Sequence, residues 1–408
     1  MPTVNTEIDM KNTDLPAIAG GKPTRKNFLY FSTPQITKDD INSVVRVMQS
    51  GWLTTGPQVT KFESKLKDLI RSKYLYAVSS CTAALHLALV VSRIRKSHEV
   101  ITSPLTFSSV ANVIMHVGAK PVFADVEKET GNIDIEEIQK KISKKTKAII
   151  VTHLFGRPVN LDEIVEIAKK YKLILIEDCA HALGAYYKGK HVGSIGDFGA
   201  FSFYVTKNIT TGEGGALTVK TQHWAELADV LRQHGLSRNS WKRYTQKNIE
   251  YYKLEAAGYK YNMTDMAAAL GISQLKRFKK NQRRRGKIWS MYDKAFPNLP
   301  LIFPPKEDKS TVHAKHIYPL ILDLKQLKVD RDKIREALAL ENIGTSVHFI
   351  SLHLQPFYKK VLGHKPDDFP NALFLSQRLV SIPMSQSLTD KDVEDVIIAF
   401  KKVVKYFS

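Results

Sequence analysis

A single lysine, Lys207, lies between a short apolar stretch and a glycine-rich turn. Before it, Phe201, Ser202 and Phe203 alternate between apolar and polar, which is the period of a half-buried strand. After it, Gly212-Glu-Gly-Gly215 allows a tight turn and a close approach of the backbone to a ligand. A lysine that is held still and shielded from water has a lowered pKa, so its neutral amine is available for Schiff-base chemistry. An exposed lysine in a hairpin is the alternative for this stretch alone.

A second candidate, Asp178, ends the apolar strand that we expect over residues 172–178. An aspartate in this position can simply cap a following helix. A buried carboxylate can also face a pyridine nitrogen and keep it protonated, which makes pyridoxal phosphate an electron sink. Asp178 and Lys207 follow strands that could share one sheet, so they could hold opposite ends of such a ring.

A cofactor of this kind also needs a phosphate site and an aromatic side chain to stack on. Thr82 opens an alanine- and leucine-rich helix directly after a short strand, and the start of a helix attracts anions. Ordinary helix capping would equally explain a hydroxyl there. Ser202 is a second phosphate candidate, and Phe107, after another strand, is a candidate for stacking.

The elements that must position these residues are strands without alternation, separated by helices. Such strands are expected over 99–102, 121–126, 147–152 and 172–178. They predict an α/β fold with a largely parallel sheet that helices cover on both faces, and ligands bind at the carboxyl ends of such strands.

Three parts of the chain differ in character. Residues 1–28 are polar and predict an extended or mobile arm, and residues 29–285 carry the strands and helices of a large domain. After a proline-rich crossing segment, residues 286–408 predict a smaller α+β domain packed on the large one. We expect the cofactor at the junction of the two domains.

Composition limits the class of protein. The chain has 408 residues, of which 43% are hydrophobic, and two dispersed cysteines, Cys81 and Cys179. Two dispersed cysteines are too few for a disulfide framework or a zinc site, so we expect no metal site. Neither a signal peptide nor an apolar run of membrane-spanning length is visible, so we expect a cytoplasmic protein. The formal net charge of +21 raises the question of nucleic acid. The densest basic run, 276–287, is better explained as the exposed side of a helix, with Leu275 and Phe278 turned inward.

Several motifs in order resemble the DegT/DnrJ/EryC1/StrS family of pyridoxal-phosphate sugar aminotransferases. The resemblance covers roughly residues 20–400, and it rests on many motifs in the same order rather than on one short match. The segments that carry it are Ser50-Gly-Trp-Leu-Thr-Thr-Gly-Pro57, Ser79-Ser-Cys-Thr-Ala-Ala-Leu85, Glu177-Asp-Cys-Ala-His-Ala-Leu-Gly184, Gly196-Asp-Phe-Gly-Ala-Phe-Ser-Phe203, Lys207-Asn-Ile-Thr-Thr-Gly-Glu-Gly-Gly215 and Ser346-Val-His-Phe-Ile-Ser-Leu-His353.

The resemblance implies fold type I, the aspartate-aminotransferase fold, with pyridoxal 5'-phosphate as cofactor. It implies that Lys207 forms a Schiff base with the cofactor and later moves the proton between substrate and cofactor. Asp178 would pair with the ring nitrogen. The other cofactor-binding residues would be Phe107 and His181 against the ring, and Thr82, Ser202 and the backbone amides of Cys81 and Thr82 at the phosphate. Cys81 stands where the family usually has glycine, and we expect a packed thiol there.

The resemblance also implies a homodimer with shared active sites. In this family an asparagine from the partner subunit reaches the phosphate, and the matching segment here is Gly258-Tyr-Lys-Tyr-Asn262. Lys260 occupies the asparagine position and Asn262 the position of a family arginine, so either could donate to the phosphate. Substrate-binding candidates are Trp52, Thr54, His153, His348 and His353, although His348 and His353 could equally be core residues.

The expected activity is transfer of an amino group, from L-glutamate, to a keto group of a nucleotide-linked deoxy-keto-sugar, with C4 favoured over C3. Surface glycans or other amino-sugar products are the expected destination. A sugar dehydratase of the same family is one alternative, although that branch has histidine where this chain has Lys207. A nucleic-acid-binding or regulatory homologue without activity is another, prompted by the charge.

Overall fold

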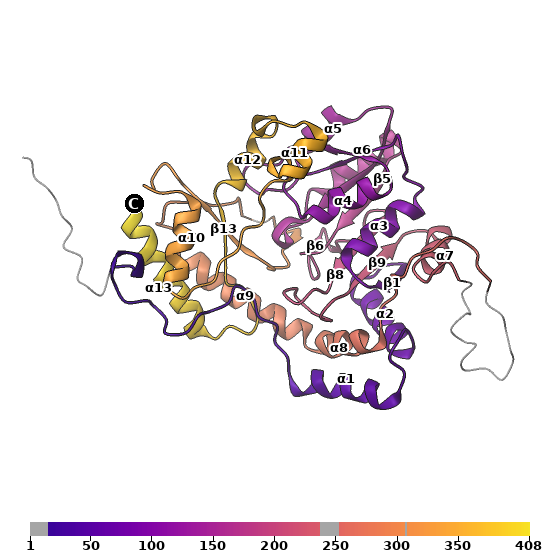
Figure 1. The fold of residues 1–408 in the computed structure, drawn as a ribbon, viewed down its shortest axis with the longest axis horizontal. Helices are drawn as coiled ribbons and strands as arrows, with labels where there is room; N and C mark the ends of the chain where they lie inside the picture. Colours follow the sequence, from indigo (N-terminus) through magenta and orange to yellow (C-terminus); the bar gives the residue numbers. More distant parts are fainter. Residues whose placement is uncertain (1–14, 237–252, 307) are drawn as a thin grey trace, which may run out of the picture.

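The computed structural model describes residues 15–236, 253–306 and 308–408, and its centre is a seven-stranded sheet (Figure 1). The strand order is β1-β9-β8-β5-β4-β2-β3. The run from β8 to β3 is parallel, whereas β9 is antiparallel to both β8 and β1. The strands are β1 (Tyr74–Val78), β2 (Glu99–Thr102), β3 (Lys120–Phe123), β4 (Thr146–Thr152), β5 (Ile174–Asp178), β8 (Phe198–Ser202) and β9 (Gly215–Val219). The mainly parallel sheet of the predicted α/β fold is confirmed.

Helices cover both faces of this sheet, which explains why its strands are apolar on both sides. One face packs against α2 (Pro57–Ile70), α5 (Ile135–Lys141), α6 (Leu161–Tyr171) and α8 (Asp265–Lys276). The other face packs against α3 (Cys81–Val91), α4 (Ser108–His116) and α7 (Gln222–Leu231). Further out, α1 (Lys38–Ser50) lies along α8 (Figure 1).

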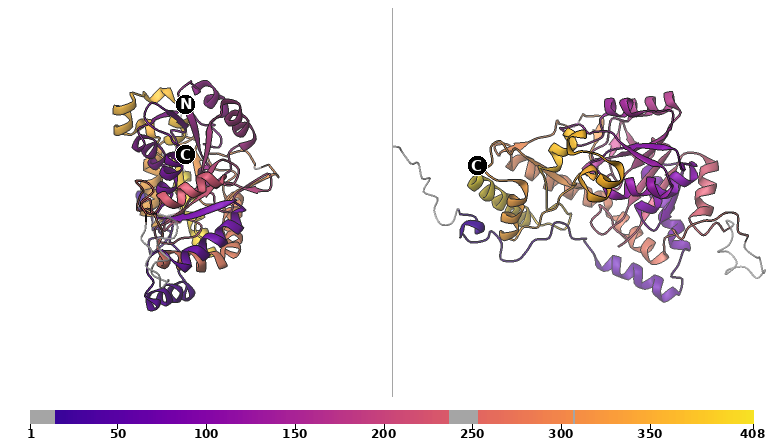
Figure 2. Two further views of the ribbon diagram at one scale, coloured as in Figure 1. Left: turned by 90° about the vertical axis from the view of Figure 1, so that its right-hand side faces the viewer. Right: turned by 45° about the horizontal axis from the view of Figure 1, so that its top comes forward.

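The C-terminal part forms a second, smaller core at the other end of the molecule (Figure 2). Its antiparallel sheet consists of β10 (Leu301–Ile302), β12 (Tyr318–Leu322) and β13 (Leu379–Ile382), packed against α10 (Arg331–Leu340) and α13 (Asp390–Phe407). Between the two parts lie α11 (Pro356–Leu362), α12 (Pro370–Ser376) and a small sheet of β6 (Tyr186–Tyr187), β7 (Lys190–His191) and β11 (Thr311–Val312).

One long helix, α9 (Phe278–Ala295), connects the two cores. Phe278 packs into the core of the large part, whereas Ile288 and Tyr292 belong to the core of the small part. The division expected between residues 285 and 286 therefore falls inside a continuous helix, and it stays a prediction.

Arg285 corrects the expectation that the basic run 276–287 is wholly solvated. Its side chain is fully buried and donates hydrogen bonds to Gln386 Oε1 at 3.0 Å and to the backbone oxygen of His316 at 3.1 Å. Carbonyl oxygens thus replace water around this guanidinium, which the charge pattern alone cannot reveal.

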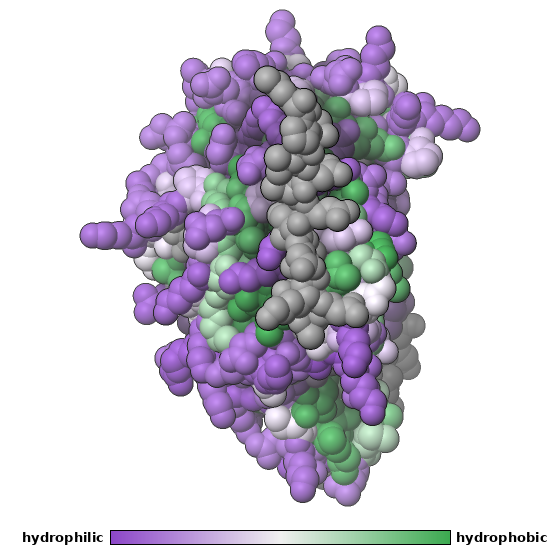
Figure 3. Space-filling view, turned by 90° about the vertical axis from the view of Figure 1, so that its left-hand side faces the viewer, coloured by the Kyte–Doolittle hydropathy of each residue, from purple (hydrophilic) through white to green (hydrophobic). Residues whose placement is uncertain are grey.

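The described part of the N-terminal arm is held on the small core. The amide of Ala17 donates to Glu341 Oε1 at 2.7 Å, and Arg25 pairs with Asp395 at 2.6 Å. Residues 1–14 of the predicted arm lie outside the described residues. The face of the molecule at this end is mostly hydrophilic, with smaller apolar areas between the polar side chains (Figure 3). Among the described residues, no helix has the length and apolar character needed to cross a membrane.

Candidate active site

A cavity of about 460 Å³ lies at the carboxyl ends of β4 and β5, where α3 begins and the small part closes over the sheet. It contains most of the predicted cofactor residues. The predicted cofactor residues in it are Cys81, Thr82, Phe107, Asp178, His181, Ser202 and Lys207. His348, predicted to bind substrate, also lines it, together with Ser80, Thr106, Ser109, Thr152, Ala180, Tyr204, Thr206, Glu213, Gly214 and Phe349.

Lys207 follows β8 in a turn, where its backbone amide donates to the oxygen of Tyr204 at 2.9 Å. Removal of its side chain from bulk water lowers its pKa from 10.5 to about 8, although Cys81 and Asp178 act in the opposite direction. About a tenth of this amine is therefore neutral and nucleophilic at pH 7, far more than for an ordinary lysine.

This pKa predicts how the free protein reacts with an amine reagent. The modification of Lys207 by trinitrobenzenesulfonate is expected to rise with pH, to reach half of its maximum near about pH 8 and to level off above about pH 9, because only the neutral amine attacks. An ordinary exposed lysine titrates near about 10.4 and continues to gain reactivity. Peptide mass spectrometry across a pH series measures both, and a Lys207 reactivity that still climbs steeply above pH 9 would contradict the lowered pKa.

Asp178 lies at the end of β5 with 3% of its surface exposed. Its Oδ1 accepts the amide of Ala180 at 3.0 Å and faces the Cys81 thiol at 3.7 Å, while Oδ2 accepts from Thr152 Oγ1 at 3.4 Å. Burial raises the pKa of Asp178, and the Ala180 amide and Lys207 oppose this effect. A cationic group in the cavity would lower this pKa again and give the carboxylate a partner.

The start of α3 offers free amide donors at one end of the cavity. Ser80 caps the helix by accepting the amide of Ala83 at 3.0 Å, whereas no hydrogen bond to another described residue satisfies the amides of Cys81 and Thr82. Gly215 packs directly under this turn, since a Cβ atom there would lie 2.4 Å from the carbonyl carbon of Ser80. Such a helix start is an anion site.

Aromatic side chains lie at the opening of the cavity. Phe107 is 58% exposed, and its ring centroid is 6.0 Å from that of Phe349. His181 stacks on Phe349 at 5.9 Å, and burial holds its pKa well below the usual value. Its buried Nδ1 has no hydrogen-bond partner among the described residues. Nδ1 of His348 forms a hydrogen bond with Ser381 Oγ at 2.9 Å, and burial lowers the pKa of His348 to about 3.

The structure does not bring two of the predicted histidines into the cavity. His153 and His353 are fully buried, and both ring nitrogens of each lie within hydrogen-bond distance of protein atoms. His353, for example, contacts Ser351 Oγ at 2.8 Å and the oxygen of Pro366 at 3.0 Å. Their surroundings are those of core residues.

Four further predicted residues lie outside the cavity of their own chain. Trp52 Nε1 donates to the oxygen of Thr55 at 3.1 Å, and Asn262 Nδ2 lies 2.6 Å from Thr55 Oγ1. The oxygen of Thr54 accepts the amide of Asp265 at 3.0 Å, and Lys260 is exposed.

Phe349, Tyr204 and Glu213 line the cavity but were not among the predicted residues. Glu213 stands inside the glycine-rich turn after Lys207, so its position was a usable signal. Phe349 follows His348 in a segment without periodicity, and only the docking of the small part brings it to the site.

Comparison with known proteins shows which family the chain belongs to. The family model for the DegT/DnrJ/EryC1/StrS aminotransferase family matches residues 34–401. The chain belongs to this family. It is a pyridoxal-phosphate-dependent sugar aminotransferase.

Curated relatives and a solved structure match the aminotransferase almost end to end. Uncharacterized protein MJ1066 of Methanocaldococcus jannaschii is 49% identical over 380 residues, 93% of this chain and 98% of that protein. The spore coat polysaccharide biosynthesis protein SpsC of Bacillus subtilis is 45% identical over 382 residues, 93% of this chain and 98% of that protein. The putative sugar aminotransferase Spr1654 of Streptococcus pneumoniae, in its PMP form, has a TM-score of 0.87 at 31% identity, covering 93% of this chain and 99% of that one, and it is also solved in a PLP form.

The aminotransferase has the chemical groups that pyridoxal phosphate requires. The Lys207 amine, with its lowered pKa, and the buried Asp178 carboxylate line the same cavity. The backbone amides of Cys81 and Thr82 offer hydrogen-bond donors to a phosphate. The cavity therefore fits the cofactor of the family.

Proposed function

We propose that the enzyme transfers an amino group from L-glutamate to a keto group of a nucleotide-linked deoxy-keto-sugar, at C4 rather than C3. The observation that carries this proposal is the half-buried Lys207, whose amine has a lowered pKa, in the same cavity as Asp178. A relative named for spore coat polysaccharide biosynthesis supports a destination in surface glycans. The basic surface, with a net charge of +21, favours an anionic substrate such as a nucleoside diphosphate.

We infer the following roles for the residues of this chain. When bound, pyridoxal phosphate supplies an aldehyde for Schiff-base exchange and a ring that absorbs carbanion charge. Asp178 would hold a proton on the ring nitrogen, and Phe107 and His181 would contact the ring. The amides of Cys81 and Thr82, with the hydroxyls of Thr82 and Ser202, would hold the phosphate. The Lys207 amine would accept and return the proton at the substrate carbon.

A homodimer with shared sites forms part of this proposal. Trp52, Thr54 and Asn262 gather around Thr55, outside the cavity of their own chain. This gathering is expected if these residues and Lys260 serve the active site of a partner subunit, at the phosphate or the sugar. His348 lines the cavity and stays a candidate for substrate contact. His153 and His353 are buried outside the cavity, which gives no support for a contact between them and the substrate.

The decisive experiment incubates the purified enzyme with L-glutamate and a panel of 3-keto and 4-keto nucleotide sugars. Mass spectrometry and NMR of the products should show the keto oxygen replaced by an amine at C4. A product that loses oxygen without gaining nitrogen would support the dehydratase alternative. Amination at C3 only, or a donor other than glutamate, would correct the finer proposal while leaving transamination intact.

A further inference from the structure

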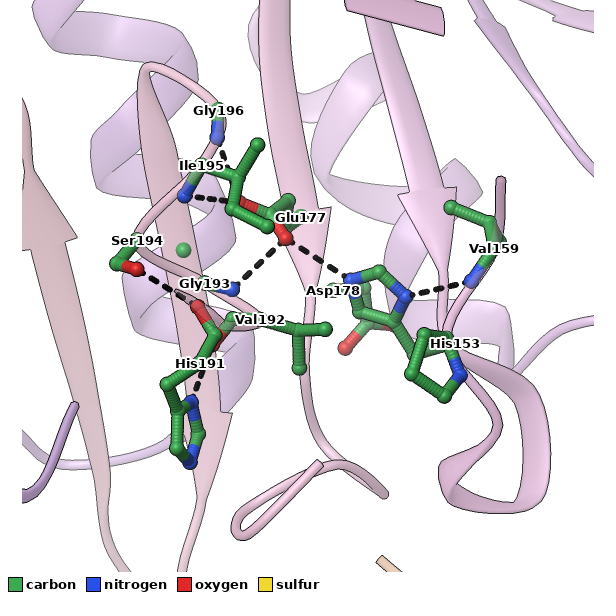
Figure 4. Close-up of polar contacts among 12 residues, drawn as sticks. His153, Val159, Glu177, Asp178, His191, Val192, Gly193, Ser194, Ile195 and Gly196 are labelled. Carbon is green, nitrogen blue, oxygen red and sulfur yellow. Dashed lines mark hydrogen bonds and ion pairs between the residues drawn. The ribbon is translucent and has the colours of Figure 1, made fainter. Parts of the chain in front are cut away.

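Glu177, next to Asp178, carries a carboxylate that the chemistry so far does not use. Its side chain is fully buried and accepts four hydrogen bonds (Figure 4). The amide of Gly193 and Nε2 of His153 lie 2.7 and 3.1 Å from its Oε2. The amides of Ile195 and Gly196 donate to its Oε1 at 2.9 and 2.6 Å. Since neighbouring strand residues point to opposite faces, Glu177 points away from the cavity that Asp178 lines.

The hydrogen bonds define the protonation of this pair. Nδ1 of His153 accepts the amide of Val159 at 3.1 Å, so the ring proton must sit on Nε2 and is donated to Glu177. Burial alone would raise the pKa of Glu177, but the bonds from His153 and from the loop amides outweigh it and hold this pKa below its usual value. Glu177 is therefore an ionised acceptor surrounded by donors.

His153, Glu177 and Cys179 also place potential ligand atoms within 4.8 Å of one another. The tautomer argues against a metal centre, because the lone pair of His153 is engaged by Val159 and its proton faces Glu177. The carboxylate oxygens are likewise each occupied by two donors. The cluster is a hydrogen-bonded anchor.

This anchor connects the segments that carry the reactive groups. The loop 193–196 leads into β8, which ends at Ser202 and is followed in the chain by Lys207. Gly193 is packed so tightly against this strand that a Cβ atom would lie 2.4 Å from the Phe201 ring. On the other side, the backbone amide of His153 donates to the oxygen of Asp178 at 3.1 Å. One carboxylate thus ties the ends of β4 and β5 to the start of β8.

We propose that Glu177 is a positioning residue of the aminotransferase: through His153 and the loop 193–196 it fixes the backbone that sets Asp178 against Lys207 across the cavity. The inference rests on the proposed function of those two residues. Glu177 itself touches neither cofactor nor substrate, so its effect must appear in the geometry that the bound cofactor experiences.

The test is Glu177→Gln, which keeps the shape but directs an NH₂ group at two donors. The holoenzyme is expected to retain cofactor on Lys207, because both reactive residues remain. Its visible circular dichroism should fall at least about twofold, the affinity for pyridoxal phosphate about tenfold, and kcat about tenfold or more, with a smaller change in KM.

Glu341→Gln is the matched control. Glu341 is also a fully buried glutamate that accepts backbone amides, those of Ala17 and Thr24, but it lies on the small core. Its substitution should lower the melting temperature of the protein while the visible circular dichroism and kcat stay at wild-type values. A loss of stability alone therefore cannot imitate the expected result.

A pair of His153 variants completes the test. His153→Gln can still donate to Glu177 and accept from Val159, so it should restore most of the wild-type signal, whereas His153→Phe should reproduce a weaker form of the Glu177→Gln effect. If Glu177→Gln does not fold, His153→Phe decides. Wild-type circular dichroism and kcat in the deciding variant would overturn the proposal. Failure of borohydride to fix cofactor on Lys207 in the wild type would instead overturn the proposed function.

Discussion

Lys207→Ala is expected to lower kcat by about 10³-fold or more and to prevent any covalent attachment of cofactor by borohydride. Both effects have one cause, since the variant has neither an amine to form the Schiff base nor a base to move the proton at the substrate carbon. Proton transfer by a positioned side chain accounts for about 10²- to 10⁴-fold in rate. Stopped assays with glutamate and intact-mass spectrometry after reduction measure the two effects.

The control for this variant is Lys279→Ala, which removes an exposed lysine from α9. This variant should keep the wild-type kcat, and borohydride should fix the cofactor on its Lys207 as in the wild type. If Lys207→Ala retains more than about a tenth of the wild-type kcat, the amine of Lys207 is not the acid and base, and another group in the cavity must be assigned that role.

Asp178→Asn is expected to have the second largest effect, a fall in kcat of about 10²-fold or more with the cofactor still attached to Lys207. The neutral amide cannot keep the ring nitrogen protonated, so the ring no longer absorbs carbanion charge effectively. The visible spectrum of the holoenzyme should change as well, because the charge next to the ring has been removed. Steady-state kinetics and absorbance on the same preparation test the two statements together.

Asp125→Asn is the matched control for a buried aspartate. Asp125 accepts the amides of Asn371 and Ala372 and does not line the cavity, so its loss should cost stability and leave the spectrum unchanged. Asp178→Glu should recover part of the lost rate, since the charge returns at a displaced position. Full activity in Asp178→Asn would remove Asp178 from the proposed mechanism.

Much of this arrangement could be predicted from the sequence because parallel strands align their carboxyl ends. Asp178, Thr82 and Phe107 each follow a strand, so an expected sheet brings them to one edge without knowledge of the loops. The strand before Lys207 and the glycines after it could equally belong to a hairpin, and only the other predicted residues made this lysine specific.

What could not be predicted depends on side-chain surroundings. His153 follows a strand just as Phe107 does, yet its ring turns inward to Glu177 and Val159, and only coordinates reveal these partners. Arg285 looked like part of an exposed basic run, and four backbone or amide oxygens make its burial possible. These acceptors lie far from Arg285 in the sequence, so a local sequence pattern cannot predict them.

The helix α9 has a further consequence for how this enzyme can be divided. Its 18 residues rise by about 27 Å, and apolar side chains at its two ends are anchored in different cores. A cut between residues 285 and 286 would leave two fragments, each with a severed half-helix and a bare apolar stripe, while Arg285 would lose its acceptors at His316 and Gln386. The two parts are therefore not independent modules. A chimera that takes the small part from a relative must include the whole of α9.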